Sequence, residues 1–487
     1  MFQYLHLEKE ICVGFAPGAV SDLDIAGRRG STVLMTGKGQ TGMKRIYEPL
    51  AYSDRPIRDR YWSRFLPVPA PAYPVLQGEA ETEFAVVGGG YTGLSAALTL
   101  AEAGAEVTLL DAATPGWGAS GRNGGLVSVG SAKLADGQIV RKFGREDAQC
   151  FFDAERAAVD LVETYLEVHG IDADRHSKGY TYVAHRPDRV AEIRAYGESY
   201  QHRYGLDYEF VPKEEMAAHG LNSPDYHGAV HLPLGFALNP MKFVLGLTAA
   251  ADKAGVTFHS QTPVVRITHD GAQHVLETPN GRLRARNLIF ATNGYSSDDL
   301  PGAFAQRYLP VQSNILVTRP LSEEEIQDQG WWSEQMVCDS RTLLHYFRLL
   351  PDRRLMLGLR GSVKVSEHDI AATRRKARAD FDRMFPKWRH VETEYFWSGL
   401  ICMTRNLVPF AGAVPGMERT WAALGYHGSG VTMAPYAGKL IAEQALGRKR
   451  RYHPAFMQRP LRPFELGPLR RLSLPLAFAW YNMKDRF

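Results

Sequence analysis

The residues most able to do chemistry are the six consecutive positions Gly88-Gly89-Gly90-Tyr91-Thr92-Gly93. They contain the spacing GxGxxG. Gly88 would permit a tight turn, Gly90 would let the backbone approach a pyrophosphate, and Gly93 would allow a helix to pack closely on a strand. A helix that starts here would face the phosphates with its partial positive charge. The spacing alone is a weak signal, so its context decides the interpretation.

The context of these glycines is the one that a dinucleotide site requires. The apolar run Phe84–Val87 precedes them as a strand, and Leu94, Ala97 and Leu98 follow at helical spacing. Glu106–Asp111 is a second strand whose final acid, Asp111, can accept hydrogen bonds from ribose hydroxyls and would repel a 2′-phosphate. The alternative is a tight glycine turn beside a solvated aspartate.

A second loop of small residues, Gly116–Gly125, directly follows the acidic strand end. Small residues at this point let a bulky planar ligand lie against the backbone, which favours FAD over NAD. A flexible surface loop is the alternative. The candidate cofactor-binding residues of this loop are Ala119, Ser120, Arg122, Asn123, Gly124 and Gly125.

A third glycine-rich element, Leu424–Val431, lies far away in the sequence. A strand, a glycine turn and a helix start are again adjacent, and the N-terminus of that helix can stabilise negative charge on the N1/O2 edge of a reduced flavin. An ordinary helix cap is the alternative. The candidate residues are Gly425, His427, Gly428, Ser429, Gly430 and Val431.

The elements that must position these loops follow from hydrophobic periodicity. The predicted helices are 145–169, 241–254, 320–328, 371–385 and 431–446. The predicted strands are 178–185, 227–232, 256–258, 264–267, 275–277 and 288–291, with 311–318, 344–350 and 354–359 in an antiparallel second layer. Residues 52–76 are rich in Pro, Arg and Tyr and are expected to form an extended arm on a surface.

Composition argues against several classes of protein. The chain has 57 Lys plus Arg and 53 Asp plus Glu, so its net charge of +4 predicts neither a nucleic-acid partner nor a polybasic membrane anchor. No apolar stretch is long enough to span a bilayer, and the four widely spaced cysteines fit a reducing compartment, so we expect a cytoplasmic protein. No metal site, HExxH motif, GxSxG elbow or P-loop is expected.

Together these motifs resemble the FAD-dependent amine and amino-acid oxidoreductases of the D-amino-acid oxidase superfamily, and most of all their gamma-glutamylputrescine oxidoreductase branch. The resemblance starts at about residue 45 and covers nearly the whole chain. It is carried by the three glycine-rich elements, Ala291–Tyr295, Tyr346–Arg348, the N-terminal arm and the Asp485-Arg486 ending. It implies an α/β fold (α+β overall) with a Rossmann-type FAD-binding domain interleaved with a substrate domain on an antiparallel sheet.

The resemblance and the composition together predict how the chain is organised. Residues 1–42 are expected to be a poorly ordered extension, with Met43 as an alternative start, and residues 43–81 an N-terminal arm. The FAD-binding domain is expected to comprise 82–175, 225–300 and 400–447, the substrate domain 176–224 and 301–399, and the C-terminal arm 448–487.

Further FAD-binding residues are implied by the resemblance. Val265 matches the strand whose backbone meets the adenine, and Ala291, Thr292 and Asn293 match the strand end that closes over the dinucleotide. From the sequence alone, Val265 fits a core strand equally well, and Asn293 fits a turn cap.

Some relatives attach the flavin covalently, through a histidine in the second loop or a cysteine before the third element. Arg122 stands where that histidine would be, and Cys402 departs from the spacing of the cysteine-linked pattern. We therefore expect FAD to be held non-covalently, with Cys402 acting as a small buried residue.

The implied reaction removes a hydride equivalent from the carbon that bears the nitrogen of an amine or amino acid, and the cofactor performs the difficult step. The candidate catalytic residues are Tyr295, Tyr346, Arg348 and His427. Arg348 is expected to bind a substrate carboxylate through both arms of its guanidinium, as in a gamma-glutamylputrescine-like substrate. A surface salt bridge for Arg348, core positions for the tyrosines and a turn cap for His427 are the alternatives.

The expected partners are a small-molecule amine and either oxygen or another electron acceptor, and the oligomeric state stays open. Two other functions remain compatible with the motifs. One is a flavin enzyme that acts on the C–O bond of a 2-hydroxy acid, and the other is a catalytically silent flavin-binding protein.

Overall fold

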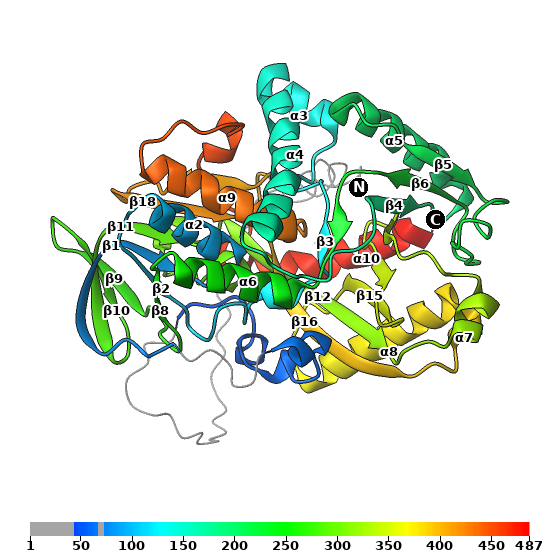
Figure 1. Cartoon of the computed structure of the whole chain (residues 1–487), viewed down its shortest axis with the longest axis horizontal. Helices are drawn as coiled ribbons and strands as arrows, with labels where there is room; N and C mark the ends of the chain where they lie inside the picture. The colour runs from blue at the N-terminus through cyan, green and yellow to red at the C-terminus, as the bar shows by residue number, and fades with distance from the viewer. Residues whose placement is uncertain (1–42, 67–72, 487) are drawn as a thin grey trace, which may run out of the picture.

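The computed structural model describes residues 43–66 and 73–486. Two sheets lie side by side, each with helices packed against it (Figure 1). The C-terminal helix α10 (Ser473–Arg486) lies near the junction of the two layers. The expected extension 1–42 lies outside the described residues.

The glycine fingerprint belongs to a sheet with the strand order β17-β18-β11-β1-β2-β8. β1 (Gly78–Val87) lies between β2 (Val107–Leu110) and β11 (Gly281–Phe290) and pairs in parallel with both. β8 (Thr257–His259) and β18 (Thr420–Leu424) extend the parallel set on its two sides. Because parallel strands are covered on both faces, they are near-continuous apolar runs, and every residue of β2 is buried.

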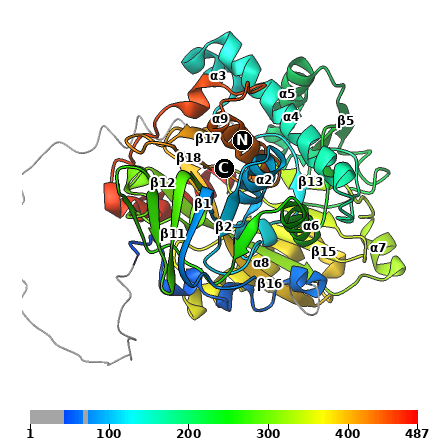
Figure 2. The same ribbon diagram turned by 60° about the vertical axis from the view of Figure 1, so that its left-hand side comes forward.

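A layer of helices covers one face of this sheet. α2 (Tyr91–Glu102) starts directly after the fingerprint and packs between α6 (Pro240–Lys253) and α9 (Gly430–Ala445), which explains why nearly all of its residues are buried. α4 (Arg145–Val168) is amphipathic and packs on α9. Figure 2 shows α2 and α6 on the same side of β1 and β2.

Antiparallel strands complete the first sheet at its edges. β9 (Arg266–His269) and β10 (His274–Glu277) form a hairpin whose second strand pairs with β11. β17 (Phe410–Ala413) pairs with β18. A separate small ladder joins β3 (Leu126–Val127) to β7 (Phe236–Ala237). β3 directly follows the second glycine-rich loop.

The second sheet has the order β16-β12-β15-β14-β13-β4-β6-β5, and its neighbours are antiparallel except for β13 with β4. Its strands are β4 (Tyr180–Val183), β5 (Glu209–Pro212), β6 (Gly228–Leu232), β12 (Tyr308–Thr318), β13 (Met336–Asp339), β14 (Tyr346–Leu349), β15 (Leu355–Arg360) and β16 (Thr393–Thr404). α8 (Glu367–Met384) packs on β12 and β15, and α7 (Glu323–Gln329) lies nearby.

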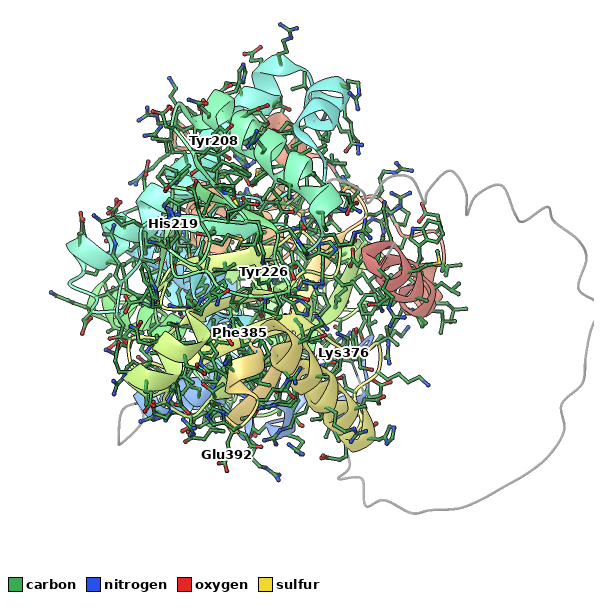
Figure 3. All side chains as sticks on the ribbon, turned by 90° about the vertical axis from the view of Figure 1, so that its right-hand side faces the viewer. Tyr208, His219, Tyr226, Lys376, Phe385 and Glu392 are labelled. Atoms are coloured by element: carbon green, nitrogen blue, oxygen red, sulfur yellow. The ribbon has the colours of Figure 1, made fainter. Side chains whose placement is uncertain are left out.

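An aromatic core fills the space between this sheet and its helices. Tyr226 stacks on Phe347 with ring centres 5.8 Å apart, and Phe385 meets Phe347 edge-on at 5.6 Å. Figure 3 looks onto this side of the molecule, where Lys376 marks the exposed face of α8. The second sheet is therefore backed by a closely packed aromatic core.

The two terminal segments differ from the expectation. The predicted extended arm contains the 3₁₀ turns Pro49–Tyr52, Arg55–Ile57 and Tyr61–Phe65. Tyr61 and Trp62 belong to the main core, because burying two aromatic side chains outweighs leaving the arm on the surface. The C-terminal arm ends in α10, where Pro475 lies in the first turn and so breaks no helical hydrogen bond.

The fold class is confirmed, and the differences are local. α3 (Asp136–Phe143) and α5 (Val190–Tyr204) were not predicted. α5 buries tyrosines at a spacing of four residues, and tyrosine gives only a weak apolar signal. The strand predicted at 264–267 begins at Arg266. β6, which was expected in the FAD-binding segment 225–300, pairs with β4 and β5 in the second sheet.

Candidate active site

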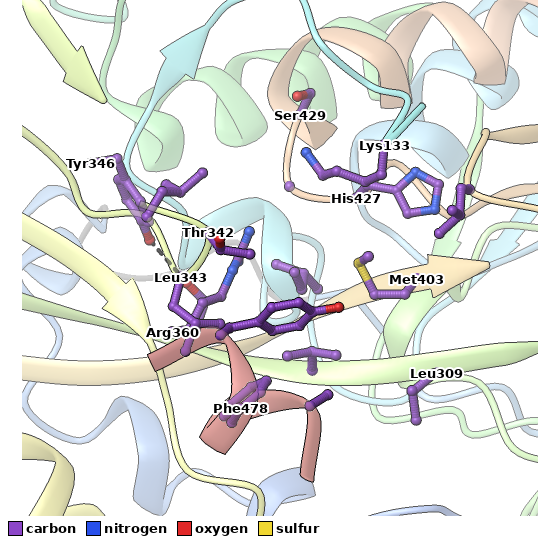
Figure 4. A pocket seen from close by; sticks show the side chains of 18 of the residues that line it. Lys133, Leu309, Thr342, Leu343, Tyr346, Arg360, Met403, His427, Ser429 and Phe478 are labelled. Atoms are coloured by element: carbon purple, nitrogen blue, oxygen red, sulfur yellow. Dashed lines mark hydrogen bonds between the residues drawn. The ribbon is translucent and has the colours of Figure 1, made fainter. Parts of the chain in front are cut away.

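A cavity of about 1250 Å³ is lined by residues from the loops of the first sheet, from the second sheet and from α10. This volume exceeds the roughly 300–1,000 Å³ of ordinary small-molecule sites, so a planar ring system and a substrate can share it. The predicted site residues in its wall are Ala119, Arg122, Asn123, Gly124, Tyr346, His427, Gly428, Ser429 and Val431. Figure 4 shows part of this wall.

The fingerprint glycines form a tight turn between β1 and α2, outside the cavity wall. A Cβ atom at Gly93 would lie 1.9 Å from the carbonyl oxygen of Gly88. Gly88 itself has a φ of +108°, and a Cβ there would lie 2.9 Å from the carbonyl oxygen of Ala291. The turn therefore requires glycine at both positions. Gly90 is the N-cap of α2 and has no side chain with which to cap the helix.

Asp111 ends β2 and faces this turn. Its carboxylate accepts hydrogen bonds from the backbone N–H groups of Gly89, at 2.7 Å, and Ala113, at 2.8 Å. Burial raises the pKa of Asp111 even though these two N–H groups oppose the shift. Each carboxylate oxygen has a further lone pair, so the residue holds the turn and can still accept a hydrogen bond from a ribose hydroxyl.

Hydrogen bonds tie the second loop to the fingerprint. Asn123 donates from Nδ2 to the carbonyl oxygens of Ala119, at 3.1 Å, and Ser120, at 2.8 Å, and its Oδ1 accepts from Gly125 N–H at 2.8 Å. Ser120 Oγ accepts from the backbone N–H of Tyr91 at 2.9 Å. The fingerprint and the second loop, which the sequence shows only to be near each other along the chain, are therefore held together by a hydrogen bond at the N-terminus of α2.

Arg122 is a buried cation in the cavity wall, 3% exposed. It donates from Nε to the carbonyl oxygen of Trp117 at 2.7 Å, and its guanidinium lies 4.1 Å from the centre of that indole. Its Nη2 is buried and has no acceptor among residues 43–66 and 73–486. An orphaned donor in a cavity wall suits a ligand edge that is rich in acceptors.

His427 does not fit the catalytic role that was expected for it. Its Nδ1–H donates to the carbonyl oxygen of Ser131 at 2.8 Å, and its Nε2 accepts from the backbone N–H of Thr404 at 3.1 Å. Burial, assisted by the nearby Lys133 cation, lowers the pKa of His427 to about 3. Because both ring nitrogens are engaged and the ring is neutral, His427 is a positioning residue that joins three segments.

The end of β11 meets the third element. Asn293, at a φ of +44°, accepts from Gly425 N–H at 3.0 Å through Oδ1. Thr92 Oγ1 lies 2.7 Å from the hydroxyl oxygen of Tyr426 and so links α2 to the same element. Thr292 hydrogen-bonds Ser296 within its own turn. These groups converge at the carboxyl ends of the parallel strands, where open α/β sheets bind their ligands.

Arg348 does not face the cavity, which corrects the expected carboxylate-binding role. Its side chain is 0% exposed and its guanidinium donates to the carbonyl oxygens of Gly124 and Leu238. Burial lowers the pKa of Arg348 to about 9. With its donors used by the backbone, Arg348 supports the second loop from behind.

The two candidate tyrosines lie in different places. Tyr346 lines the cavity, with its hydroxyl 3.1 Å from Ser313 Oγ and its ring against Gly358, where a Cβ would lie 2.0 Å from Cζ. Tyr295 is not in the cavity wall. Its hydroxyl accepts from Leu400 N–H at 3.3 Å, and its ring meets Trp117 edge-on. Tyr295 therefore braces the second loop and is not placed to contact a substrate.

Val265 and Cys402 lie away from the cavity. Val265 precedes β9 and donates its backbone N–H to the carbonyl oxygen of Glu277, so its contact with an adenine stays a prediction. Cys402 is 1% exposed in β16 and belongs to a core cluster, whereas its neighbours Ile401 and Met403 line the cavity. Burial raises the pKa of the Cys402 thiol to about 12, which disfavours a reactive thiolate.

The cavity wall contains functional groups that the sequence reasoning missed. Lys133 and Arg360 line it beside the third element, and Leu474, Phe478 and Tyr481 of α10 close another side. Lys133 stands in no motif. Arg360 could have been noticed as the charged end of an otherwise apolar strand.

The residues present fit FAD on structural grounds. Gly90 provides no side-chain cap for α2 and lacks the Cβ that would lie 2.9 Å from Ser120 Oγ, and Nη2 of Arg122 has no acceptor among the described residues. These features leave room and hydrogen-bonding capacity for a dinucleotide. Within the described part of the chain no cluster of His, Cys, Asp and Glu could hold a metal ion. In those same residues no helix has the length and apolar character needed to cross a bilayer.

A glycine turn at the carboxyl end of a parallel sheet, joined to a cavity against an antiparallel sheet, is an arrangement that suits a dinucleotide cofactor beside a small-molecule substrate. Residues 83–444 match the family described as FAD dependent oxidoreductase (DAO), and the chain belongs to this family. It is an FAD-dependent oxidoreductase of this type.

Relatives agree with this assignment. The probable oxidoreductase OrdL of Rhizobium meliloti (strain 1021) is 35% identical, over 86% of this chain and 95% of its own length. The gamma-glutamylputrescine oxidoreductase of Escherichia coli (strain K12) is 31% identical, over 82% of this chain and 92% of its own. The crystal structure of glycine oxidase from Geobacillus kaustophilus superposes with a TM-score of 0.64 at 20% identity, over 78% of this chain and 98% of that one, which supports the fold.

Proposed function

We propose that the protein oxidises the C–N bond of an amine or amino acid to an imine, which water then hydrolyses to a carbonyl compound and a free amine. Bound FAD would supply the acceptor for the hydride equivalent, two electrons and one proton, that leaves the carbon bearing the nitrogen, and the N–H proton of the resulting iminium ion would pass to water. Oxygen or another carrier would be the final electron acceptor. The similarity to a gamma-glutamylputrescine oxidoreductase supports an amine of that kind as substrate.

The observation that carries this proposal is the shared cavity. The second loop and the third element face β12, β14 and β15 across it, so one space adjoins both the FAD-binding sheet and the antiparallel sheet. The wall includes Tyr346, Leu343 and Phe478, which exclude water and favour the uncharged amine that hydride removal requires. His427 and Arg348 hold the loops in place and move no proton.

We also propose that FAD is bound without a covalent link. Arg122 replaces the histidine of one covalent pattern, and the thiol of Cys402 lies in a core cluster and not in the cavity wall. Oxidation of a 2-hydroxy acid is the second candidate function, because the same cavity can hold a substrate with a C–OH group in place of the C–N group.

Anaerobic mixing of the purified holoenzyme with separate panels of amines and 2-hydroxy acids tests these functions. Bleaching of the flavin absorbance by amines alone is the expected result. Bleaching by hydroxy acids alone would replace C–N with C–O oxidation. A flavin that neither panel bleaches would mean that the protein binds FAD without this catalysis.

A further inference from the structure

A set of large apolar side chains is exposed near the C-terminus. Of the nine exposed large apolar residues among residues 43–66 and 73–486, six lie between positions 466 and 483. Single exposed apolar side chains are ordinary on a protein surface, whereas six within one short segment mark an interaction site. We call this set the apolar stripe; it consists of Leu466, Leu469, Leu472, Leu476, Trp480 and Met483.

The spacing of the apolar stripe places its members along one line. The 3₁₀ turn Gly467–Leu472 leads directly into α10. Residues three apart eclipse each other in a 3₁₀ turn, so Leu469 and Leu472 share one edge. Within α10, Leu476, Trp480 and Met483 follow at steps of four and three residues, which is one face of an α-helix. The stripe is therefore continuous from the turn to the last helical turn of the chain.

The inner face of α10 is packed against the second sheet, while its outer face is apolar and uncovered. Leu474 and Tyr481 are buried, and Leu474 joins a cluster with Leu309 of β12. Of the exposed residues of α10, only Asn482 and Arg486 are polar. Figure 3 shows this helix, in red, at the edge of the molecule. A helix that is apolar on both sides is typical of a buried element, so the outer face requires a partner that residues 43–66 and 73–486 do not supply.

Basic residues dominate the segment that carries the apolar stripe. Residues 459–486 contain six Lys or Arg and two acids. Both acids are engaged within the protein, because Glu465 pairs with Arg405 and Asp485 accepts hydrogen bonds from backbone N–H groups of the 342–343 loop. Three of the cations form no ion pair with a residue in the described ranges: Arg462, Lys484 and Arg486.

This combination of groups is complementary to an anionic lipid surface. Apolar side chains can insert below the headgroups while neighbouring cations contact anionic headgroups. Trp480 is a type of side chain that favours the boundary between headgroups and acyl chains. A second copy of the chain fits less well, since a two-fold contact would bring identical cations together. Residues 1–42 contain four acids and four Lys or Arg, so they offer no net negative charge.

We propose that the apolar stripe docks the protein on the surface of a bilayer that contains anionic phospholipids, with α10 lying in the plane of the interface. Leu466, Leu472 and Leu476 belong both to the stripe and to the wall of the large cavity. Docking therefore brings the mouth of that cavity to the lipid surface. The protein lies on the membrane and does not span it. This inference goes beyond the proposed C–N oxidation and does not depend on it.

Binding of the purified holoenzyme to vesicles tests the apolar part of this surface. Vesicles of phosphatidylcholine and phosphatidylglycerol in equal parts are compared with vesicles of phosphatidylcholine alone, and flotation in a density gradient gives the partition coefficient. The stripe variant combines Leu469→Gln with Trp480→Gln, neither of which lines the cavity. Its matched control combines Val168→Gln with Trp332→Gln, two exposed apolar residues outside the stripe.

A second pair of variants tests the charges. The charge variant combines Lys484→Gln with Arg486→Gln. Its matched control combines Lys253→Gln of α6 with Arg286→Gln of β11, which removes two exposed cations from the first sheet and its helices. Tm and the flavin-to-protein ratio check that every variant is folded and loaded.

We expect the wild type to bind the mixed vesicles, and to bind vesicles of phosphatidylcholine alone more weakly because their headgroups carry no net charge. The stripe variant and the charge variant should each lose about tenfold or more of the partition coefficient, while both controls change less than about twofold. A wild type that does not bind the mixed vesicles would overturn the proposal, and so would a stripe variant that binds them as the wild type does.

Two further results would assign the stripe to another partner and overturn the proposal. One is a dimer in light scattering that the stripe variant dissociates, without vesicle binding by the wild type. The other is vesicle binding that appears only when the chain starts at Met43, because residues 1–42 would then cover the stripe.

Fluorescence places Trp480 relative to the bilayer. Lipids brominated in their acyl chains quench the emission of a tryptophan that inserts among them. Trp480→Phe keeps an apolar ring, so this variant should still bind the mixed vesicles but lose the quenching that the wild type shows. Quenching that persists in Trp480→Phe would mean that a different surface of the protein enters the bilayer.

Discussion

Arg348 donates two hydrogen bonds to the carbonyl oxygen of Gly124, from Nε at 3.2 Å and from Nη2 at 2.9 Å. Nη2 also donates to the carbonyl oxygen of Leu238 at 2.7 Å, and Nη1 lies 2.7 Å from His176 Nε2. A fully buried guanidinium is tolerated only while such acceptors surround it. Arg348 therefore fixes the second loop against the segment that precedes α6.

The first prediction concerns this brace. Arg348→Lys should lower the free energy of unfolding by about 2–4 kcal/mol, because one ammonium cannot reach the acceptors of the planar fork. The fall in kcat/KM should be equal on an amine with a carboxylate and on a plain alkyl diamine, since no substrate contact is removed. Chemical denaturation and kinetics on both amines measure these effects. A fall in kcat/KM confined to the amine with a carboxylate would support Arg348 as a substrate-binding residue, as expected from the sequence.

The second prediction concerns the fingerprint turn. Gly90→Val should yield a protein without flavin, because the new side chain enters the space beside Ser120 Oγ and the N-terminus of α2. Gly302→Val is the matched control, since a Cβ at Gly302 meets no atom within 4 Å. The absorbance of the purified proteins gives the flavin content. A yellow, fully loaded Gly90→Val protein would contradict the assignment of the phosphate site.

The third prediction concerns the link between protein and flavin. Acid precipitation should leave all flavin in the supernatant, because the Cys402 thiol is buried in a core cluster away from the cavity. Cys402→Ala should retain the flavin content of the wild type and lose only the packing of one small side chain. Flavin fluorescence of pellet and supernatant checks both expectations. Flavin that stays in the pellet of the wild type but not in the pellet of Cys402→Ala would reveal a thioether bond.

The fourth prediction concerns pH. The folded pKa of His427, about 3, lies below the unfolded value of about 6.5, so the unfolded chain binds more protons between these limits. The free energy of unfolding should therefore fall as pH drops from about 6.5, with His427 contributing up to about 1.4 kcal/mol per pH unit. His427→Gln should reduce this slope. Above about pH 7.5 the free energy of unfolding that the substitution removes should be independent of pH. Denaturation series across this range measure the slope, and an unchanged slope would mean that His427 protonates in the folded state.

The fifth prediction concerns the C-terminal helix. Asp485 accepts from the backbone N–H groups of Thr342, at 2.8 Å, and Leu343, at 3.1 Å, and both of these residues line the cavity. Asp485→Ala should raise KM several-fold with a smaller effect on kcat, because the loop loses two hydrogen bonds worth about 1–3 kcal/mol together. Asp485→Asn is the matched control, since it keeps one acceptor oxygen. Its KM should lie between those of the wild type and Asp485→Ala. Equal KM values in all three proteins would mean that the loop does not depend on this contact.

The elements with a strong local signal could be predicted from the sequence. β1, α2 and β2 follow from an apolar run, a glycine turn and helical spacing, because backbone sterics at Gly88 and Gly93 act over a few residues. α5 could not be predicted, since its buried face consists of tyrosines. The Asn293 contact with Gly425 joins positions 132 residues apart, and no local pattern encodes such a pairing.

The sequence by itself determined the fold class, the family and the position of the glycine turn between β1 and α2, because these depend on short spacings and on residue types that few other structures require. Only the tertiary structure decided which charged groups face the cavity. Tyr346 and Arg348 lie two residues apart on one strand, yet Tyr346 lines the cavity and Arg348 is covered by the second loop. Lys133 and Arg360 are far apart in the chain and meet only because the two sheets pack against each other, so their shared positive field exists only in the folded protein.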